Sequence, residues 1–153
     1  MWQAVLKVLV VMMENNEFRT LKGYQIKNNK QITGAMEDYL EMICRYSEKD
    51  GYARINHLAE KLNVKPSSAS KMVAHLKELD LVDYEKYGVV TLTEKGRKLG
   101  DYLLYRHDTL HKFLCLLNHT ADELEQVEQI EHFFDEKTIR NLEQLNKQLE
   151  AGG

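Results

Sequence analysis

Apolar residues recur at helical spacing through most of this chain, in runs separated by polar turns. From Thr33, apolar positions three and four residues apart predict a helix that ends near Ser47. The same spacing predicts further helices over residues 55–62, from Pro66 onward, from Thr93 to about Leu117, from Thr120 to about Phe133, and from Asp135 to Leu149. The pattern is therefore typical of a mainly helical protein.

One segment instead has the character of a pair of strands. Residues 81–85 and 89–92 are rich in β-branched and apolar residues and flank the turn Lys86-Tyr87-Gly88. They follow two short helices that are joined by the turn Asn63-Val64-Lys65. Two helices and then a two-stranded wing are the order of a winged helix-turn-helix, which we place over residues 51–92.

The second helix of this motif opens with residues that suit a DNA groove. Pro66 fits the first helical position, because the N–H that it lacks would have no partner there. Small hydroxyl side chains and lysines let the backbone approach the major groove and contact phosphates or base edges. The predicted DNA contacts are Lys65, Pro66, Ser67, Ser68, Ser70 and Lys71, with Lys86 and Tyr87 at the tip of the wing. A winged domain that binds no DNA is the alternative.

Charge is distributed unevenly along the 153 residues. The net charge is -3, yet residues 51–100 hold nine Lys/Arg against six Asp/Glu, a local charge of +3. Residues 101–153 hold five against eleven, a local charge of -6. Attraction to phosphates depends on the local patch, so the middle segment is the expected nucleic-acid face. The acidic last third suggests cation binding.

Cysteine usage argues against a disulfide framework. Cys44 and Cys115 lie far apart in apolar helical patterns, and the chain has no CxxC motif. A zinc ribbon is excluded for the same reason. We therefore expect a protein of the reducing cytoplasm.

The N-terminal extension, residues 1–33, is the least informative part. Residues 1–13 are nearly apolar but too short to span a bilayer, and they lack the flanks of a signal peptide, so no membrane partner is expected. We expect translation to begin at Met12 or Met13 and the extension to be partly disordered. A basic arm that touches DNA is the alternative, formed by Arg19, Lys22, Lys27 and Lys30.

Side chains that bind hard or borderline metals lie on three of the predicted helices. The candidate ligands are Asp38, Glu41, His107, Glu128, Glu131 and His132. The first two are three residues apart, and the last three occupy positions i, i+3 and i+4, so each set shares a helix face. His111, one turn after His107, is a competing ligand. Carboxylates and imidazoles without thiolate favour Mn2+ over Zn2+ or Cu+ and leave Fe2+ open.

Several motifs occur together in one order. They are MEDYLE at 36–41, GYARI at 51–55, LAEKLNVKPSSASKMV at 58–73, LTEKG at 92–96, YRH at 105–107 and EQIEH at 128–132. Over residues 34 to about 140 the chain resembles the diphtheria-toxin-repressor-like metalloregulators, and more narrowly their manganese-responsive branch. The resemblance implies a winged helix-turn-helix DNA-binding domain over residues 34–100 and a helical metal-binding and dimerisation domain over residues 101–153.

The resemblance also implies a mechanism. All six candidate ligands match ligand positions of a binuclear Mn2+ site, in which we expect Glu41 and Glu131 to bridge. A homodimer would bind a palindromic operator in double-stranded DNA and repress metal-uptake genes when metal is bound. The apolar stripe of the last predicted helix, Ile139, Leu142, Leu145 and Leu149, is a suitable dimer interface.

Two other classes of function make different demands on the sequence. A ferritin-type di-metal enzyme needs two Glu-x-x-His motifs from a four-helix bundle, and the sequence contains none, so no enzymatic activity is expected. A winged-helix regulator that responds to Fe2+, to a small organic ligand or to no ligand is the remaining alternative. Without a ligand, its DNA binding would be independent of metal.

Overall fold

The computed structural model describes residues 2–7, 32–85 and 88–152. The chain divides into two units, residues 1–33 and 34–153. Within the first unit, residues 2–7 are helical. The expected start at Met12 or Met13 and the expected basic arm fall on residues 8–31, outside the described residues.

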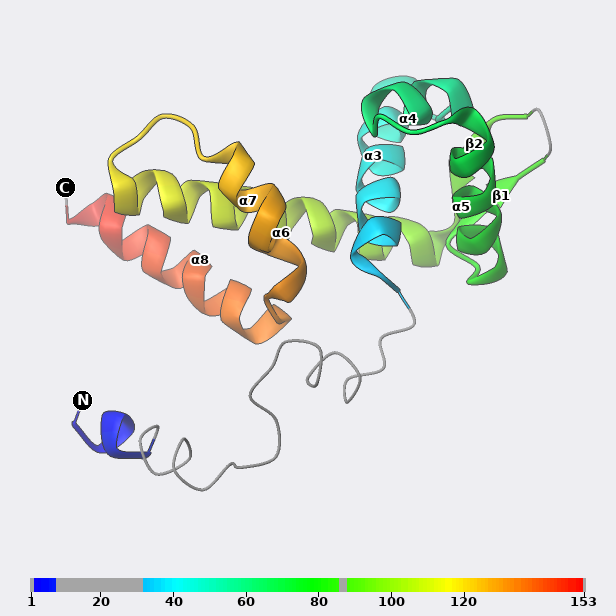
Figure 1. Ribbon diagram of the computed structural model, residues 1–153. Helices are drawn as coiled ribbons and strands as arrows, with labels where there is room; N and C mark the ends of the chain where they lie inside the picture. Colours follow the sequence, from blue (N-terminus) through cyan, green and yellow to red (C-terminus); the bar gives the residue numbers. More distant parts are fainter. Residues whose placement is uncertain (1, 8–31, 86–87, 153) are drawn as a thin grey trace. The chain divides into compact units, whose positions relative to one another are not determined.

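The second unit is mainly helical with a two-stranded wing, which confirms the predicted fold class (Figure 1). Its elements in chain order are α3 (Gly34–Asp50), α4 (Ile55–Lys61), α5 (Pro66–Glu78), β1 (Val82–Tyr84), β2 (Val90–Leu92), α6 (Glu94–Asn118), α7 (Leu124–Ile130), the 3-10 turn η1 (Glu131–Phe133) and α8 (Glu136–Ala151). No helix in the described part of the chain combines the length and apolar character that a membrane span requires.

The helix-turn-helix packs on α3. Leu58 of α4 and Val73 and Leu76 of α5 are fully buried, together with Leu40 of α3. The turn between α4 and α5 places Asn63 in the left-handed region, with a φ of 53°, and α5 then begins at Pro66 as predicted. Because α5 is fixed to α3 by this core, a displacement of α3 also displaces α5.

The wing is shorter than the sequence pattern suggests. Its antiparallel strands pair Val82 with Leu92 and Tyr84 with Val90. Lys77 of α5 donates to the backbone oxygen of Tyr84 at 2.7 Å, which ties the wing to the second helix of the motif. Residues 86–87 lie outside the described residues, so Lys86 and Tyr87 stay predictions as DNA contacts.

A glycine near the start of α6 has a specific role. Thr93 caps this helix by accepting from the backbone N–H of Gly96 at 2.9 Å. A Cβ at Gly96 would lie 1.8 Å from the backbone oxygen of Leu81. Glycine is a poor helix former, but here only glycine lets α6 begin directly against the residue that precedes the wing.

The long helix α6 connects the two ends of this unit. The helix-turn-helix and wing lie near its first half, and α7 and α8 lie along its second half (Figure 1). It passes without a break through position 100, where we placed the domain boundary. The predicted domains therefore share one helix, and that boundary stays a prediction.

The second half of α6 forms a core with α7 and α8. Leu110, Leu114, Val127 and Ile139 are buried in it, and Leu142 packs against it. Leu145 and Leu149 are 39% and 43% exposed. The predicted apolar stripe of α8 is thus divided, because its first half is used within the chain and only its second half faces outward.

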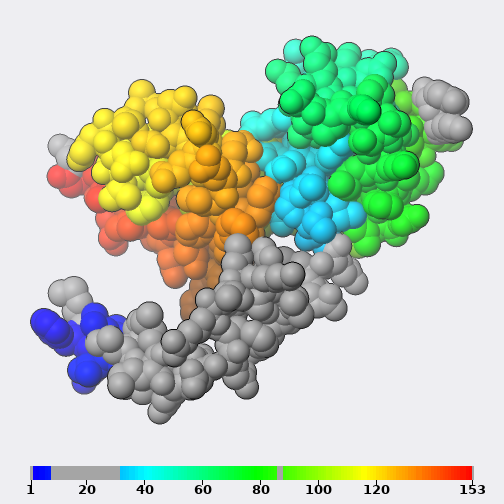
Figure 2. Space-filling view, in the orientation of Figure 1, coloured from blue at the N-terminus to red at the C-terminus, as the bar shows by residue number. Residues whose placement is uncertain are grey.

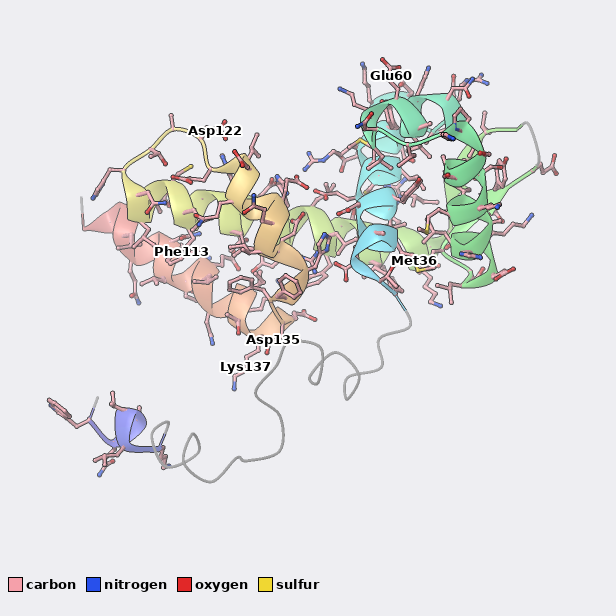
Figure 3. The ribbon with its side chains drawn as sticks, viewed as in Figure 1. Met36, Glu60, Phe113, Asp122, Asp135 and Lys137 are labelled. Carbon is pink, nitrogen blue, oxygen red and sulfur yellow. The ribbon has the colours of Figure 1, made fainter. Side chains whose placement is uncertain are left out.

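The connection to α7 differs from the prediction. The segment begins where His119 takes a left-handed conformation, with a φ of 56°, and α7 begins only at Leu124. Thr120 does not cap it: its hydroxyl donates to the Glu123 carboxylate at 2.6 Å, and Asp122 accepts from the Leu124 N–H at 3.0 Å. Asp122 lies in this connection in Figure 3. The residues after His119 are used to reverse the chain, which delays the helix.

Candidate metal centre and nucleic-acid interface

Three parts of the fold meet where the acidic and imidazole side chains gather. The helix α3 contributes Asp38 and Glu41, α6 contributes His107, and the 3-10 turn η1 contributes Glu131 and His132. Figure 2 shows the atoms of the α7–η1 region, in orange, directly against those of α3, in cyan. The centre therefore joins the DNA-binding half of the unit to its C-terminal half.

Within the described residues, the candidate ligands form two groups of three. Asp38, Glu131 and His132 form one, and Glu41, His107 and Glu131 form the other. In each group the potential donor atoms lie within 4.8 Å of one another. Glu131 belongs to both, so the geometry suits two neighbouring cations that share one carboxylate.

Contacts within the groups are short. His107 Nδ1 lies 3.2 Å from Glu131 Oε2 and 3.6 Å from Glu41 Oε1. His132 Nε2 lies 2.9 Å from Asp38 Oδ1. Each imidazole thus faces carboxylates, and both kinds of donor bind divalent first-row metals.

Burial distinguishes this cluster from solvated carboxylates. Glu131 is 1% exposed, and its Oε1 is buried without a hydrogen-bond partner. Glu41 is also buried, although its Oε1 accepts from Arg45 at 2.9 Å. Buried charges are normally paired or bound to metal, and a buried polar atom without a partner is uncommon. A cation near Glu131 Oε1 fits this arrangement.

The pKa values of several side chains in the cluster are raised by burial and by neighbouring carboxylates. Burial, and then the nearby Glu131 carboxylate, raise the pKa of Glu41. The same two causes raise the pKa of Glu128. The hydrogen bond with Glu131 raises the pKa of His107, and hydrogen bonds with Asp38 and Glu37 raise the pKa of His132 to about 10. A divalent cation would reverse these shifts, because it favours the deprotonated form of each group.

Glu128 lies at the rim of the centre. Its carboxylate is 3.7 Å from His107 Nδ1, but 56% of the side chain is exposed, and it belongs to neither group of three. The prediction that Glu128, Glu131 and His132 share one α-helical face is wrong, because α7 ends at Ile130 and a 3-10 turn follows. The turn brings Glu131 inward, while Glu128 keeps an exposed position on α7.

The competing candidate His111 lies outside both groups. Its Nε2 accepts from the backbone N–H of Glu123 at 3.3 Å and lies 3.3 Å from Asp122 Oδ1. His111 therefore stabilises the connection that precedes α7. His107 is the imidazole of α6 that faces the centre.

Two charged residues beside the centre were missed by the sequence reasoning. Arg106 of α6 and Glu37 of α3 form a buried ion pair, 4% and 9% exposed. Burial opposes ionisation of Glu37, but hydrogen bonds from His132 and Arg106 together lower the pKa of its carboxyl group. Their sequence positions could have identified them, since each directly precedes a candidate ligand and lies on the inward face of its helix.

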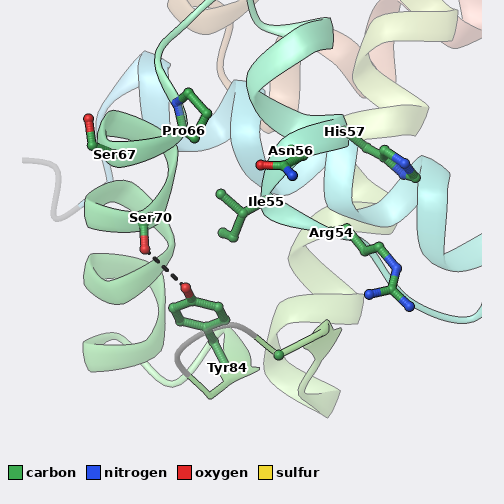
Figure 4. Close-up of a pocket in the computed structure, with 9 residues that line it drawn as sticks. Arg54, Ile55, Asn56, His57, Pro66, Ser67, Ser70 and Tyr84 are labelled. Atoms are coloured by element: carbon green, nitrogen blue, oxygen red, sulfur yellow. Dashed lines mark hydrogen bonds between the residues drawn. The ribbon is translucent and has the colours of Figure 1, made fainter.

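Most of the predicted DNA-contacting residues that the structure describes are exposed. Lys65, Pro66, Ser67, Ser68 and Lys71 are exposed at the start of α5. Ser70 is only partly exposed, and its hydroxyl is hydrogen-bonded to the hydroxyl of Tyr84 at 3.0 Å (Figure 4). Ser70 thus connects α5 to the wing in addition to any contact with DNA.

A hollow of about 570 Å³ lies beside this surface (Figure 4). Its lining combines residues before and within α4, the start of α5 and the wing. They are Arg54, Ile55, Asn56, His57, Pro66, Ser67, Ser70, Tyr84 and Gly88. The sequence reasoning missed Arg54, Asn56 and His57, which are exposed beside the predicted contacts and add a cation and polar donors to this face.

Comparison with known families agrees with both halves of this unit. Residues 31–90 match the model "Iron dependent repressor, N-terminal DNA binding domain". Residues 93–151 match "Iron dependent repressor, metal binding and dimerisation domain". The first match ends at the start of β2, and the second begins directly before α6.

Individual relatives point the same way. The HTH-type transcriptional regulator MntR of Oceanobacillus iheyensis is 41% identical over 114 residues, which cover 74% of this chain and 78% of that protein. The regulator of the same name from Geobacillus kaustophilus is 43% identical over 114 residues, with 74% and 81% covered.

Solved structures share the fold. The manganese regulator SloR matches with a TM-score of 0.64 and 35% identity over 73% of this chain. The chain spans 53% of SloR. It spans 51% of the protein described as T. acidophilum IdeR, which matches with a TM-score of 0.58 and 28% identity over 69% of this chain. The chain belongs to the iron-dependent repressor family and is a metal-dependent DNA-binding transcriptional regulator, not an enzyme.

Proposed function

We propose that this protein is a Mn2+-dependent transcriptional repressor with a binuclear metal centre. The proposed ligands are Asp38, Glu41, His107, Glu128, Glu131 and His132, with Glu41 and Glu131 bridging. The observation that carries the proposal is the pair of three-residue groups that share buried Glu131. Glu128, at 3.7 Å from His107, completes the set from the rim.

The choice of metal is supported by the donors. Both groups contain only carboxylate oxygens and imidazole nitrogens, and carboxylates suit Mn2+ while thiolates select softer metals. The regulator SloR is described as a manganese regulator. The family models are named for iron, so Fe2+ is the competing ion and belongs in the same experiment.

The carboxylates of α3 and η1 provide the switch. In the metal-free protein Glu41 and Glu131 carry like charges close together, and their repulsion opposes the packing of α3 against η1. A divalent cation bound there would supply positive charge and remove this repulsion. Asp38 and Glu41 would then be held against Glu131 and His132, which would restrict the position of α3 relative to the C-terminal half.

Packing carries this restriction to the DNA-binding face. Because α3 shares a core with α4 and α5, fixing α3 fixes the start of α5. In a homodimer, the two α5 helices must enter major grooves about 34 Å apart to read a palindromic operator. A coupling of about 1–3 kcal/mol between metal and DNA binding tightens the operator complex roughly 5- to 150-fold.

The regulatory outcome follows from this coupling. A cytoplasmic repressor that binds its operator only when metal is bound closes metal-uptake genes when the metal is abundant. Contacts from Lys65, Ser67, Ser68 and Lys71 to phosphates would position α5, since all four are exposed at its start.

Counting bound Mn2+ tests the proposed centre. The metal-stripped protein is titrated with Mn2+, and free Mn2+ is measured by electron paramagnetic resonance; an anaerobic Fe2+ titration follows. We expect two Mn2+ per chain. Asp38→Asn removes a ligand from one group and His107→Ala from the other, so each variant should lose one ion at the concentration that saturates the parent.

A matched control is Glu125→Gln, an exposed glutamate on α7 that belongs to neither group. It should bind two ions with the affinity of the parent. If both ligand variants also bind two Mn2+ at the parent affinity, the proposed ligand set is wrong.

A further inference from the structure

Behind one group of candidate ligands lies a trio of charged side chains from three elements. Glu37 comes from α3, Arg106 from α6 and His132 from η1. Glu37 Oε2 is bound by Arg106 Nη2 and lies 3.1 Å from His132 Nδ1. Arg106 Nη2 is itself 3.3 Å from His132 Nδ1. Glu37 and Arg106 are buried, so water does not compete for these contacts.

Chemistry fixes the roles of Arg106 and Glu37, whereas His132 Nδ1 donates or accepts according to its tautomer. Arginine can only donate, and an ionised carboxylate can only accept. Glu37 Oε2 therefore accepts from Arg106. The contact of His132 Nδ1 with Glu37 Oε2, at 3.1 Å, is shorter than its 3.3 Å contact with Arg106 Nη2, which favours an N–H at Nδ1 that donates to Glu37. Arg106 Nη2 and the N–H of His132 Nδ1 then both donate to Oε2 of Glu37, which accounts for the short distance between the two nitrogens.

We propose that Glu37, held in place by Arg106, is a positioning residue that keeps the proton of His132 on Nδ1 and directs Nε2 to the metal. This inference rests on the proposed metal centre. His132 Nε2 lies 2.9 Å from Asp38 Oδ1, inside one group of candidate ligands. The hydrogen bond at one ring nitrogen of a histidine determines which nitrogen remains for a metal.

A glycine completes the support of the ring. A Cβ on Gly34 would lie 3.2 Å from Cγ and from Cδ2 of His132. Gly34 and Glu37 are three residues apart in the first turn of α3, so they face the ring from the same side. The backbone at Gly34 limits the ring position and Glu37 limits its rotation.

The consequence is a selective effect on one of the two groups. Hydrogen-bond partners of metal-binding histidines typically contribute 10- to 100-fold to metal affinity. Glu37 contacts His132, whereas His107 contacts Glu131, Glu41 and Glu128. Loss of Glu37 should therefore weaken the group of Asp38, Glu131 and His132 more than the group that contains His107.

The test uses Zn2+ as a diamagnetic probe and the full chain labelled with 15N-histidine. Long-range 1H–15N correlation spectra show which ring nitrogen of each histidine carries the proton, and His132→Gln assigns the His132 signals. In the parent protein loaded with Zn2+ we expect His132 to carry its proton on Nδ1 and the metal on Nε2. Metal on Nδ1 would overturn the proposal.

Two variants separate positioning from folding. Glu37→Gln removes the anionic acceptor and should lower the Zn2+ affinity of the group of Asp38, Glu131 and His132 by 10- to 100-fold, with an altered Nδ1–H signal. Gly34→Ala keeps the ion pair but displaces the ring, and it should weaken the same site. Thermal unfolding of each metal-free variant shows whether it is folded.

Glu60→Gln, at an exposed position of α4 far from the centre (Figure 3), is the control and should match the parent. If the parent binds no Zn2+, the proposed metal centre itself fails. If the parent binds as expected but both variants keep its affinity within twofold and its His132 spectrum, only the role of Glu37 is refuted.

Discussion

Replacing Glu131 with glutamine separates the metal centre from the fold that carries it. Glutamine keeps the size of the side chain and removes its charge. Glu131 is shared by both groups of candidate ligands and is 1% exposed, so one substitution alters both groups without creating a cavity. The proposed function predicts opposite consequences with and without metal.

In the metal-free protein the effects of Glu131→Gln oppose each other. The substitution removes the repulsion from Glu41, while an amide atom still occupies the unpaired position of Glu131 Oε1, where a lone polar atom costs about 1–3 kcal/mol in both proteins. Against this, the hydrogen bond with His107 loses its charge assistance, about 1 kcal/mol. Because these terms are similar in size, the free energy of unfolding should change by less than about 2 kcal/mol.

With metal the two proteins should differ clearly. At a free Mn2+ concentration of 100 times the parent Kd, binding of one ion stabilises the parent by about 2.7 kcal/mol. That corresponds to roughly 5–11 °C in Tm for a chain of this size. A variant whose Kd is about 100-fold weaker gains only about 0.4 kcal/mol at the same concentration, which is about 1–2 °C.

The assay is thermal unfolding followed by circular dichroism, with chelator or with Mn2+, at one fixed protein concentration because dimerisation also shifts Tm. Glu125→Gln, at an exposed position on the preceding helix α7, should behave as the parent. A Glu131→Gln variant that keeps the full Mn2+-induced rise in Tm would refute the assignment of Glu131.

Three further predictions concern other parts of the molecule. Gly96→Ala should lower the free energy of unfolding in urea by about 3 kcal/mol or more, because its Cβ would meet the backbone oxygen of Leu81; an unchanged urea midpoint would contradict this. Lys71→Ala should weaken binding to all DNA sequences alike and reduce the slope of log K against log salt by about 1 in gel-shift titrations. A loss confined to one sequence would instead indicate base contact. The pKa of His132 is about 10, so metal must displace its proton at neutral pH, and Mn2+ affinity should rise as the pH increases from about 6.5 towards 10. Calorimetry in buffers of different ionisation heat should detect the released protons, and heats independent of the buffer would argue against this.

The fold was largely predictable because its signals are local. Pro66 marks the start of α5, and apolar spacing placed α3, α6 and α8 within a few residues of their observed bounds. The six candidate ligands were also identifiable, since carboxylates and imidazoles at helical spacing are visible in the sequence. The structure brings five of them into the two groups and leaves Glu128 at the rim.

The differences arise where tertiary contacts decide. Nothing in the sequence around Ile130 ends a helix, yet α7 stops there and Glu131 turns inward to His107. Likewise, the ion pair between Glu37 and Arg106 joins residues 69 positions apart, and charged residues are usually solvated, so no local pattern reveals it. Tertiary burial thus decided both the shape of the centre and its supporting shell.

The most direct test of the account is the affinity of the metal-stripped protein for a palindromic duplex, enriched from a random pool with the Mn2+-loaded protein. Affinity is measured at one fixed salt concentration with Mn2+ and with chelator. The proposed coupling predicts binding roughly 5- to 150-fold tighter with Mn2+. Equal affinity in chelator and in Mn2+ would contradict metal control of DNA binding in this protein.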